Sequence, residues 1–294
     1  MTASGPLLRI KSGPHAWAVR LDAVERVTRP GDSPIDREGA QALIHDDVGP
    51  VPLQSLAGPL ALSEGQRILW LRTDEDRLAI AVDAIGDRLP STDLHPLPAM
   101  PFAEPPPILG LAGGDASALP VLDLKQLSSP LPPAASAPSL QKGAALAEDH
   151  EAALMLLPPL GTAADGPPLT PAVSSAQVLG VEAAGEVTPL PSLPAWCLGA
   201  GWWLGRPVGV FSVARRLAPT SGAARGGRWL IAAMPGGGRL ALEIDGRCTV
   251  EPLPERATVE PAPGPVGEAI YGLFETAEHR LALLDLERWQ RASL

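Results

Sequence analysis

Cysteine is scarce in this sequence, which contains only Cys197 and Cys248. Two cysteines without a CxxC pair provide neither a disulfide framework nor a thiolate zinc site, so a disulfide-rich secreted scaffold and a zinc module are both excluded. Basic residues are also few, since 23 Lys and Arg face 33 Asp and Glu and leave a net charge of -10. That charge repels a phosphate backbone and an anionic membrane surface, so nucleic acid is not expected as a partner.

Long apolar runs are absent as well. Near-continuous apolar stretches such as residues 152–157 fall far short of the ~20 residues that a membrane-spanning helix needs. The N-terminus lacks a basic segment followed by an apolar one, which a secretion signal would have. These features predict a cytoplasmic protein without direct membrane insertion.

The residues that are plentiful are those that separate short strands. The chain of 294 residues has 35 Pro and 30 Gly, and many of them lie between apolar runs of five to seven residues. Runs of this length that end in turn residues are typical of strands. Helical patterns are brief, at residues 21–27, 122–127 and 283–289. The sequence therefore predicts a mainly β protein with short helices.

Length and composition divide the chain into two domains. A single core rarely grows beyond roughly 200 residues, and the 45% of hydrophobic residues suffices for two cores. Residues 128–150 begin SSPLPPAASAP and contain almost no large apolar residue until Leu146. Pro and Ala at this density favour an extended linker. We expect domain 1 over residues 1–127, the linker over 128–150, and domain 2 over 151–294 with a divergent N-terminal part.

A duplication relates the two predicted domains. Residues 77–83 (RLAIAVD) resemble residues 239–245 (RLALEID), where 239 minus 77 and 245 minus 83 both give 162. The same offset relates ILGL at 108 to IYGL at 270 and LDL at 122 to LDL at 284. Earlier in the chain the offset falls to 157 and then 154, as changes in loop length would cause. The sequence thus predicts two copies of one β domain.

Each copy resembles the CheW family, the adaptor modules of bacterial chemosensory arrays. In the first copy, HAWAV at 15–19 followed by LDAVERV at 21–27 resembles the second strand of the family and the turn after it. The segment VPL at 51–53 resembles the Val-Pro-Val strand, and residues 67–82 resemble the central hairpin. The second copy matches well over residues 228–290 and loosely over residues 152–187.

The resemblance implies a fold and a set of partners. Each domain would be a pair of small five-stranded β-barrels with short helices, and would have no catalytic centre, metal or cofactor. One barrel face would dock the regulatory domain of a CheA-type histidine kinase, and the groove between the barrels would receive a chemoreceptor tip. Other CheW-like proteins are further possible partners by the same resemblance.

The sequence departs from the family where binding is expected. The family carries an Asn-x-Arg-Gly turn before its Val-Pro-Val strand, but here the Arg position holds Asp47 in the first copy and Leu204 in the second. A family Asp two residues past that strand is replaced by Ser55 and Ser212. Tryptophans near the second turn fit either an interface, where aromatics are enriched, or a barrel core. Our candidates for partner binding are Asp47, Val51, Leu53, Leu56, Trp202, Trp203, Leu204, Val208 and Val210.

Enzymatic alternatives find little support. The tightest polar cluster, His45-Asp46-Asp47, is able in principle to bind a metal or transfer protons, but it lies among turn residues and is better explained as a solvated loop. The triple glycine at 236–238 lacks the Lys and Ser or Thr of a phosphate loop and fits a hairpin turn. The sequence therefore predicts no catalytic residue, no metal site and no cofactor.

Three functions fit these observations. The first is a cytoplasmic, non-enzymatic adaptor that couples chemoreceptors to a CheA-type kinase in control of motility and is recruited to receptor arrays. The second is a degenerate CheW-like docking scaffold that binds a different motility or polar protein outside the array. The third is a protein that binds a small molecule at the interface of the two copies.

Overall fold

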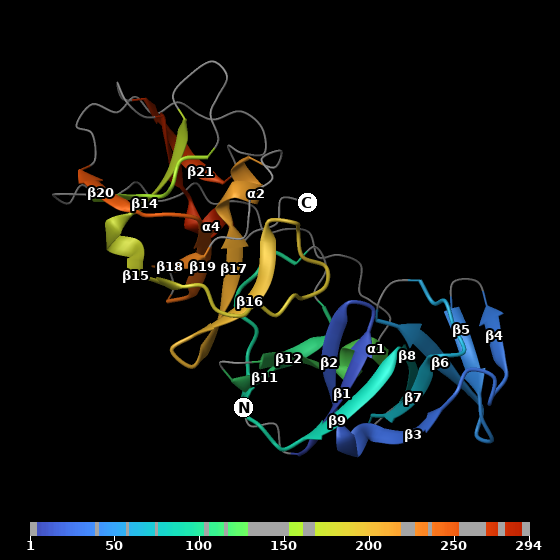
Figure 1. Cartoon of the computed structure of the whole chain (residues 1–294). Helices are drawn as coiled ribbons and strands as arrows, with labels where there is room; N and C mark the ends of the chain where they lie inside the picture. Colours follow the sequence, from blue (N-terminus) through green and yellow to red (C-terminus); the bar gives the residue numbers. More distant parts are fainter. Residues whose placement is uncertain are drawn as a thin grey trace. The chain divides into compact units, whose positions relative to one another are not determined.

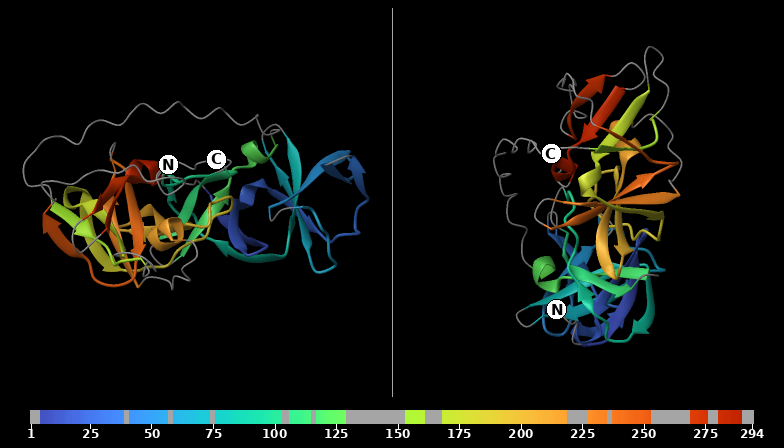
Figure 2. Two further views of the ribbon diagram at one scale, coloured as in Figure 1. Left: turned by 90° about the horizontal axis from the view of Figure 1, so that it is seen from above. Right: turned by 90° about the vertical axis from the view of Figure 1, so that its left-hand side faces the viewer.

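The computed structural model describes most of the chain. The described residues are 5–38, 41–56, 59–73, 76–102, 106–114, 117–128, 153–160, 168–218, 227–234, 237–252, 269–275 and 280–289. The predicted linker, apart from Ser128, lies outside them, as do Gly236 and the charged run at 148–151. The described part is mainly β with short helices, as predicted (Figures 1 and 2).

The chain splits into two compact units. Unit 1 comprises Met1–Leu97 and Pro106–Pro133, and unit 2 comprises Pro98–Pro105 and Ala134–Leu294. The short segment Pro98–Pro105, which we had placed in domain 1, is therefore assigned to unit 2.

Unit 1 contains two sheets of six strands. The first has the order β10-β11-β12-β2-β1-β9 and the second β3-β7-β8-β6-β5-β4. Their bounds are β1 Leu7–Ser12, β2 His15–Arg20, β3 Val24–Thr28, β4 Ile35–Glu38, β5 Gln41–His45, β6 Pro50–Ser55, β7 Arg67–Arg72, β8 Arg77–Val82, β9 Ala84–Leu89, β10 Leu94–His95, β11 Ile108–Gly114 and β12 Ser117–Leu122, with helices η1 Leu21–Ala23 and α1 Leu124–Ser128.

Unit 2 contains two sheets of five strands. Their orders are β20-β13-β14-β22-β21 and β15-β18-β19-β17-β16. Their bounds are β13 Ala153–Leu156, β14 Leu169–Ser174, β15 Val178–Ala183, β16 Cys197–Trp203, β17 Arg206–Ser212, β18 Arg228–Ala233, β19 Arg239–Ile244, β20 Thr249–Pro252, β21 Ile270–Glu275 and β22 Arg280–Leu284, with helices η2 Ser175–Gln177, α2 Val213–Leu217 and α4 Leu286–Trp289.

The two units arrange their strands in the same order. With β4 and β10 left out, the sheets of unit 1 have the order of those of unit 2, and each sheet contains one parallel pair. The residue registers agree with the offsets in the sequence. Leu53 pairs with Ala79 as Val210 pairs with Ala241, and the differences are 157 and 162. The bulges at Ile108 and Ile270 are likewise 162 residues apart.

The prediction of closed five-stranded barrels is wrong. Each sheet runs in a linear order with two end strands, and the sheets of unit 1 have six strands because β4 and β10 extend them. In unit 2 the place of β4 beside β5 is reduced to one bridge, Thr188 to Ala200. In the second sheet of each unit, the end strands β3 and β15 are connected to the β5–β6 and β16–β17 hairpins by side chains rather than by a backbone ladder.

The predicted positions of the short helices agree only in part with the structure. The pattern at 21–27 is helical only at Leu21–Ala23, because the β-branched Val24 and Val27 continue as β3 and pair with β7. The two terminal helices exist and begin after an aspartate in both units. Asp123 Oδ1 accepts the backbone N–H of Lys125, and Asp285 Oδ1 accepts that of Arg288. These caps explain the repeated Leu-Asp-Leu motif.

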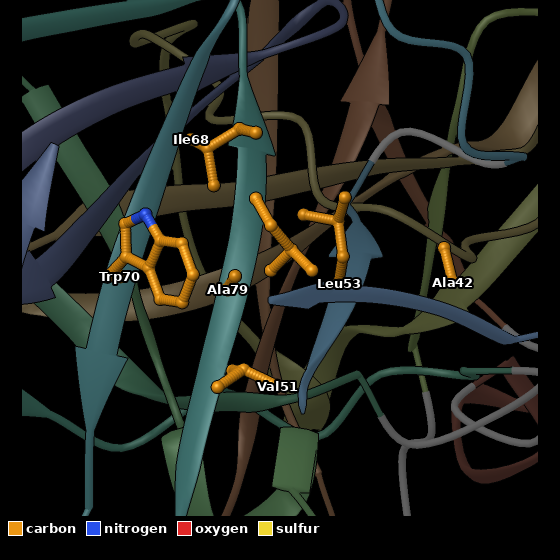
Figure 3. Packing of buried hydrophobic residues seen from close by; sticks show 7 residues of the cluster. Ala42, Val51, Leu53, Ile68, Trp70 and Ala79 are labelled. Carbon is orange, nitrogen blue, oxygen red and sulfur yellow. The ribbon is translucent and has the colours of Figure 1, made fainter. Parts of the chain in front are cut away.

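Alternating side chains of the strands form the cores. In the second sheet of unit 1, buried side chains from β5, β6, β7 and β8 point toward one another (Figure 3); they are Ala42, Ile44, Val51, Leu53, Ile68, Trp70 and Ala79. The corresponding cluster of unit 2 contains Val208, Val210, Trp229, Ile231 and Ala241.

The two cores differ in which positions hold the large side chains, and Trp70 of unit 1 corresponds to Ile231 of unit 2. By register, Ile44 and Ile68 of unit 1 correspond to Gly201 and Trp229 of unit 2. A Cβ at Gly201 would lie 2.5 Å from an indole carbon of Trp229, so the larger side chain on β18 requires the glycine on β16. Both cores are filled, but by different residues.

This difference in packing generates a prediction. We expect Gly201→Ala to destabilise the protein by about 1–3 kcal/mol through overpacking, and Trp229→Ile to destabilise it by leaving a cavity. Combined, the two changes should cost less than their sum by about 0.5–3 kcal/mol. Urea unfolding of the full chain measures this coupling, and strictly additive costs would contradict the proposed packing.

Candidate functional site

Four of the predicted partner-binding residues lie in the cores. Val51 and Leu53 of β6, and Val208 and Val210 of β17, are all less than 5% exposed. Strand residues alternate between two faces, and these four occupy the inward face. Their assignment to a binding surface is therefore wrong, because a partner cannot reach them while the sheet is folded.

The remaining candidates cluster around two hairpin loops. Asp47 is exposed in the loop between β5 and β6, and Leu204 is exposed in the turn between β16 and β17. Trp202 and Trp203 are half-buried at the end of β16, and Leu56 is half-buried just after β6. We call residues 46–49 tip 1 and residues 204–205 tip 2. The two tips connect corresponding strands of the two units.

Each tip presents a large apolar side chain to solvent. Val48 of tip 1 is 82% exposed and Leu204 of tip 2 is 77% exposed, the highest values among the large hydrophobic residues that the structure describes. Sequence reasoning missed Val48, although its place between Asp47 and Gly49 in a loop was a usable signal. Exposed apolar side chains in corresponding hairpin loops mark these tips as candidate docking surfaces.

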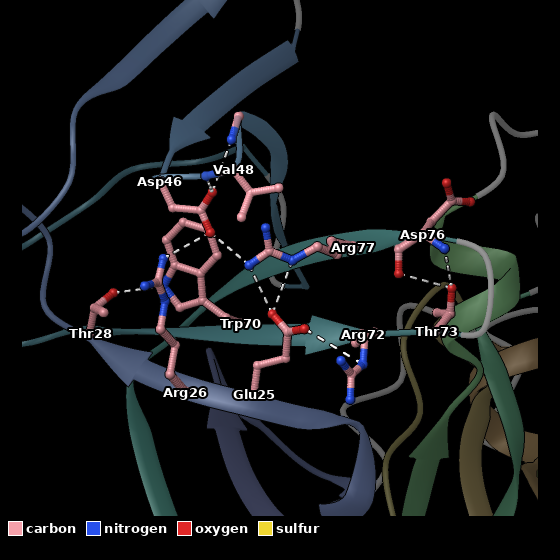
Figure 4. Close-up of polar contacts among 11 residues, drawn as sticks. Glu25, Arg26, Thr28, Asp46, Val48, Trp70, Arg72, Thr73, Asp76 and Arg77 are labelled. Atoms are coloured by element: carbon pink, nitrogen blue, oxygen red, sulfur yellow. Dashed lines mark hydrogen bonds and ion pairs between the residues drawn. The ribbon is translucent and has the colours of Figure 1, made fainter.

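Asp46 holds tip 1 in place (Figure 4). Its side chain, 5% exposed, accepts hydrogen bonds from Arg77 at 2.6 Å and from Arg26 at 3.1 Å. The other carboxylate oxygen accepts the backbone N–H groups of Val48 at 2.9 Å and Gly49 at 3.1 Å. Since Arg26 belongs to the end strand β3, this carboxylate connects one end of the sheet to the β5–β6 loop.

A second carboxylate and an aromatic ring complete this cluster. Glu25 Oε2 accepts a hydrogen bond from Arg77 Nε at 3.0 Å, and Glu25 Oε1 lies 3.6 Å from Arg72 Nε. The Arg26 guanidinium lies 4.1 Å from the centroid of Trp70, whose indole N–H donates to Thr28 Oγ1 at 2.9 Å. Arg77 therefore binds two carboxylates while Arg26 is fixed by one carboxylate and one ring.

The charges of the cluster stabilise one another. The hydrogen bond from Arg77, with further ones from the Val48 and Gly49 backbone, holds the pKa of Asp46 well below its usual range. Asp46 and then Glu25 raise the pKa of Arg77. The interpretation of His45-Asp46-Asp47 as a solvated loop is thus wrong for Asp46, while the neighbouring His45 Nε2 lies 2.9 Å from Asp36.

Tip 2 is held by different chemistry at the corresponding place. Leu204 and Gly205 both have positive φ, +48° and +71°, which forms a tight two-residue hairpin turn. Trp203 Nε1 donates to Glu182 Oε1 of β15 at 2.8 Å, and the guanidinium of Arg239 lies 5.1 Å from the Trp203 ring. Arg239 corresponds to Arg77, so the same arginine supports both hairpins through different partners.

Trp196, the third tryptophan near this turn, is half-buried and packs against other aromatic side chains of unit 2. It stacks on Phe211 at 5.9 Å and meets Trp289 edge-on at 6.1 Å. The guanidinium of Arg216 lies 3.8 Å from its ring. This cluster joins the β17–α2 region to the C-terminal helix α4, which is a structural role.

Reactive groups are poorly arranged for chemistry in the described residues. No group of three or more His, Cys, Asp or Glu side chains there is placed to hold a metal ion. Burial raises the pKa of the Cys197 thiol to about 12 and also raises that of Cys248, which disfavours the reactive thiolate. Among these residues no helix is long and apolar enough to cross a membrane.

Comparison with known proteins finds similarity among solved structures alone. No protein-family model matches the chain, and no curated protein matches it. The crystal structure of the scaffolding protein TtCheW from Thermoanaerobacter tengcongensis is similar, with 18% sequence identity and a TM-score of 0.37. The match covers 49% of this chain and 91% of that chain.

The ion cluster at tip 1 predicts a pH dependence. Because the pKa of Asp46 is lowered by folding, its charge stabilises the protein above the pKa of about 3.9 that an unfolded Asp has, and this contribution is lost as the pH falls further. We expect Asp46→Asn to lower the urea midpoint at pH 7, and the difference from wild type to shrink below about pH 4.

The neighbouring Asp47 provides the matched control. Asp47→Asn changes an exposed carboxylate of the same loop and should leave the urea midpoint unchanged at both pH values. Equal effects of the two substitutions, or a difference for Asp46→Asn that persists unchanged to pH 2, would contradict the role given to the Asp46 charge.

Proposed function

We propose that this chain is a non-enzymatic docking adaptor composed of two duplicated CheW-like domains. The observation that carries the proposal is a hairpin that recurs in both units, is fixed from its neighbouring strands and presents an apolar side chain at its tip. One solved structure to which the chain is similar is that of a scaffolding protein. We place the two domains at residues 1–127 and 151–294, joined by the linker at 128–150, although the compact units group Pro98–Pro105 with unit 2.

The equal strand orders support a duplication. Three strand pairs of unit 1 recur in unit 2 at the offsets seen in the sequence. The pair Ala18–Val121 corresponds to Ala172–Leu283, with offsets of 154 and 162. The pair Leu53–Ala79 corresponds to Val210–Ala241, with offsets of 157 and 162, and the pair Val24–Leu71 corresponds to Val178–Ala232, with a first offset of 154. Leu71 and Ala232 in the last pair differ by 161 rather than 162, because the turn between β18 and β19 is one residue longer than the turn between β7 and β8. A gene duplication explains such agreement more simply than convergence.

The partners follow from the CheW-like sequence pattern. We propose the regulatory domain of a CheA-type histidine kinase and chemoreceptor tips, and also other CheW-like proteins. The protein would then act in the cytoplasm at receptor arrays in control of motility. Two domains on one chain would strengthen weak individual contacts through effective concentration.

A second candidate function is favoured by the chemistry of the tips. The arginine of the family turn is replaced by Asp47, which is exposed, and by Leu204. A change of charge sign at a contact surface excludes old partners and admits new ones. The alternative is therefore a CheW-like scaffold that binds a different motility or polar protein outside the array.

Binding measurements on the full chain test the proposal. We expect the wild type to bind the kinase regulatory domain or a receptor-tip fragment of the same organism in biolayer interferometry. Val48→Asp or Leu204→Asp should weaken that binding at least tenfold, about 1.4 kcal/mol, as loss of a hot-spot side chain does. Val250→Asp is the control, because Val250 is 58% exposed on β20 in another sheet.

The outcomes separate the two candidate functions. If the folded wild-type chain binds neither protein, the result would favour the second candidate function, a CheW-like scaffold that acts outside the array. Binding that all three substitutions leave unchanged would show that neither tip is a docking surface.

A further inference from the structure

Leu204 occupies a position that folding does not favour. It is the first central residue of a turn that requires positive φ at both central residues, and its own φ is +48°. Asn, Asp and Gly adopt this conformation readily, whereas a side chain such as Leu is strained in it. The side chain is also 77% exposed, so it gains little from burial within the chain.

Neither the backbone conformation nor hydrophobic burial therefore favours leucine at this position. Backbone strain disfavours it in the turn, and hydrophobic burial does not compensate because most of its surface is in water. A residue that is unfavourable for the isolated chain is explained by a contact that the chain makes with another molecule. The observed strain thus points to docking at tip 2.

The surface next to Leu204 is preorganised. Trp203 is half-buried, with its indole N–H bound to Glu182 at 2.8 Å and its ring covered by the Arg239 guanidinium at 5.1 Å. Those contacts fix the ring before any partner arrives. Fixed aromatic surfaces bind with a small loss of conformational entropy.

The charge around tip 2 is positive. Arg206 follows the turn directly and is exposed, and Arg239 lies over Trp203. Neither guanidinium forms an ion pair with a residue that the structure describes. The nearby carboxylate of Glu182 is engaged by the indole N–H of Trp203. A local cationic surface on a chain with a net charge of -10 selects for carboxylates.

The corresponding tip of unit 1 has the opposite sign. There, Val48 stands beside the exposed carboxylate of Asp47, while the arginines of the cluster are engaged by Asp46 and Glu25. The apolar side chain is common to both tips and the flanking charge is not. Tip 1 is therefore an internal comparison for the role of charge at tip 2.

We infer that tip 2, with Trp203, Leu204, Arg206 and Arg239, docks a segment of a partner protein whose apolar side chains are flanked by carboxylates. Leu204 and the edge of Trp203 meet the apolar side chains, and the two guanidinium groups pair with the flanking carboxylates. This inference rests on the proposed docking function and gives the chemical class of one partner.

A pair of synthetic peptides tests the inference on the full chain. Both peptides carry the same helical stripe of leucines, flanked in one by glutamates and in the other by lysines. Titrations followed by the indole N–H resonance of Trp203, assigned with Trp203→Phe, should show binding of the glutamate peptide at least tenfold tighter than that of the lysine peptide. Added salt should reduce this preference.

Three variants identify the contact. Leu204→Asn should raise the melting temperature, because Asn suits the turn, and should at the same time weaken glutamate-peptide binding at least tenfold. Arg206→Glu should reverse the peptide preference. Val48→Asp, in the corresponding hairpin loop of unit 1, should leave the affinity unchanged. A simple loss of folding cannot produce the first result, since stability and binding move in opposite directions.

The inference is overturned if the two peptides bind equally, if neither binds, or if Leu204→Asn does not change the affinity. Self-association of the chain that Leu204→Asn abolishes, without peptide binding, would assign tip 2 to a second copy and also overturn it. These results are separate from the kinase and receptor measurements, whose failure would leave the peptide preference intact.

Discussion

In the second sheet of each unit, side-chain contacts connect an end strand to the hairpin near the opposite end of the sheet. In unit 1 the Asp46 carboxylate receives Arg26 from β3, and in unit 2 the Trp203 indole donates to Glu182 on β15. No backbone ladder makes these connections, because both sheets have two end strands. These contacts therefore help to position each hairpin and the apolar side chain at its tip.

The same framework supports two surfaces of different chemistry. Arg77 and Arg239 occupy corresponding positions at the start of β8 and β19. The first neutralises two carboxylates, and the second covers an aromatic ring. In addition, Val48 directly follows the acidic Asp47, whereas the basic Arg206 lies two residues after Leu204. Two hairpin tips that differ in this way give the two proposed docking contacts different charges.

The sequence predicted the β class and most strands, because short apolar runs that end in turn residues are directly visible in it. It did not predict which face of a strand is buried beside an irregular loop, so Val51 and Val210 were mistaken for surface residues. The role of Asp46 was missed because its partners, Arg26 and Arg77, are distant in sequence. Barrel closure was expected by resemblance alone, and the two end strands of each sheet contradict it.

Hydrogen–deuterium exchange of the full chain, with and without a bound kinase regulatory domain or receptor-tip fragment, tests most directly whether the hairpin tips are the docking surfaces. The account predicts that a bound partner slows exchange of the backbone amides in residues 46–49 or 202–206 and leaves β20 unchanged. Slower exchange confined to the sheets that contain β1 and β13, with both tips unprotected, would contradict it.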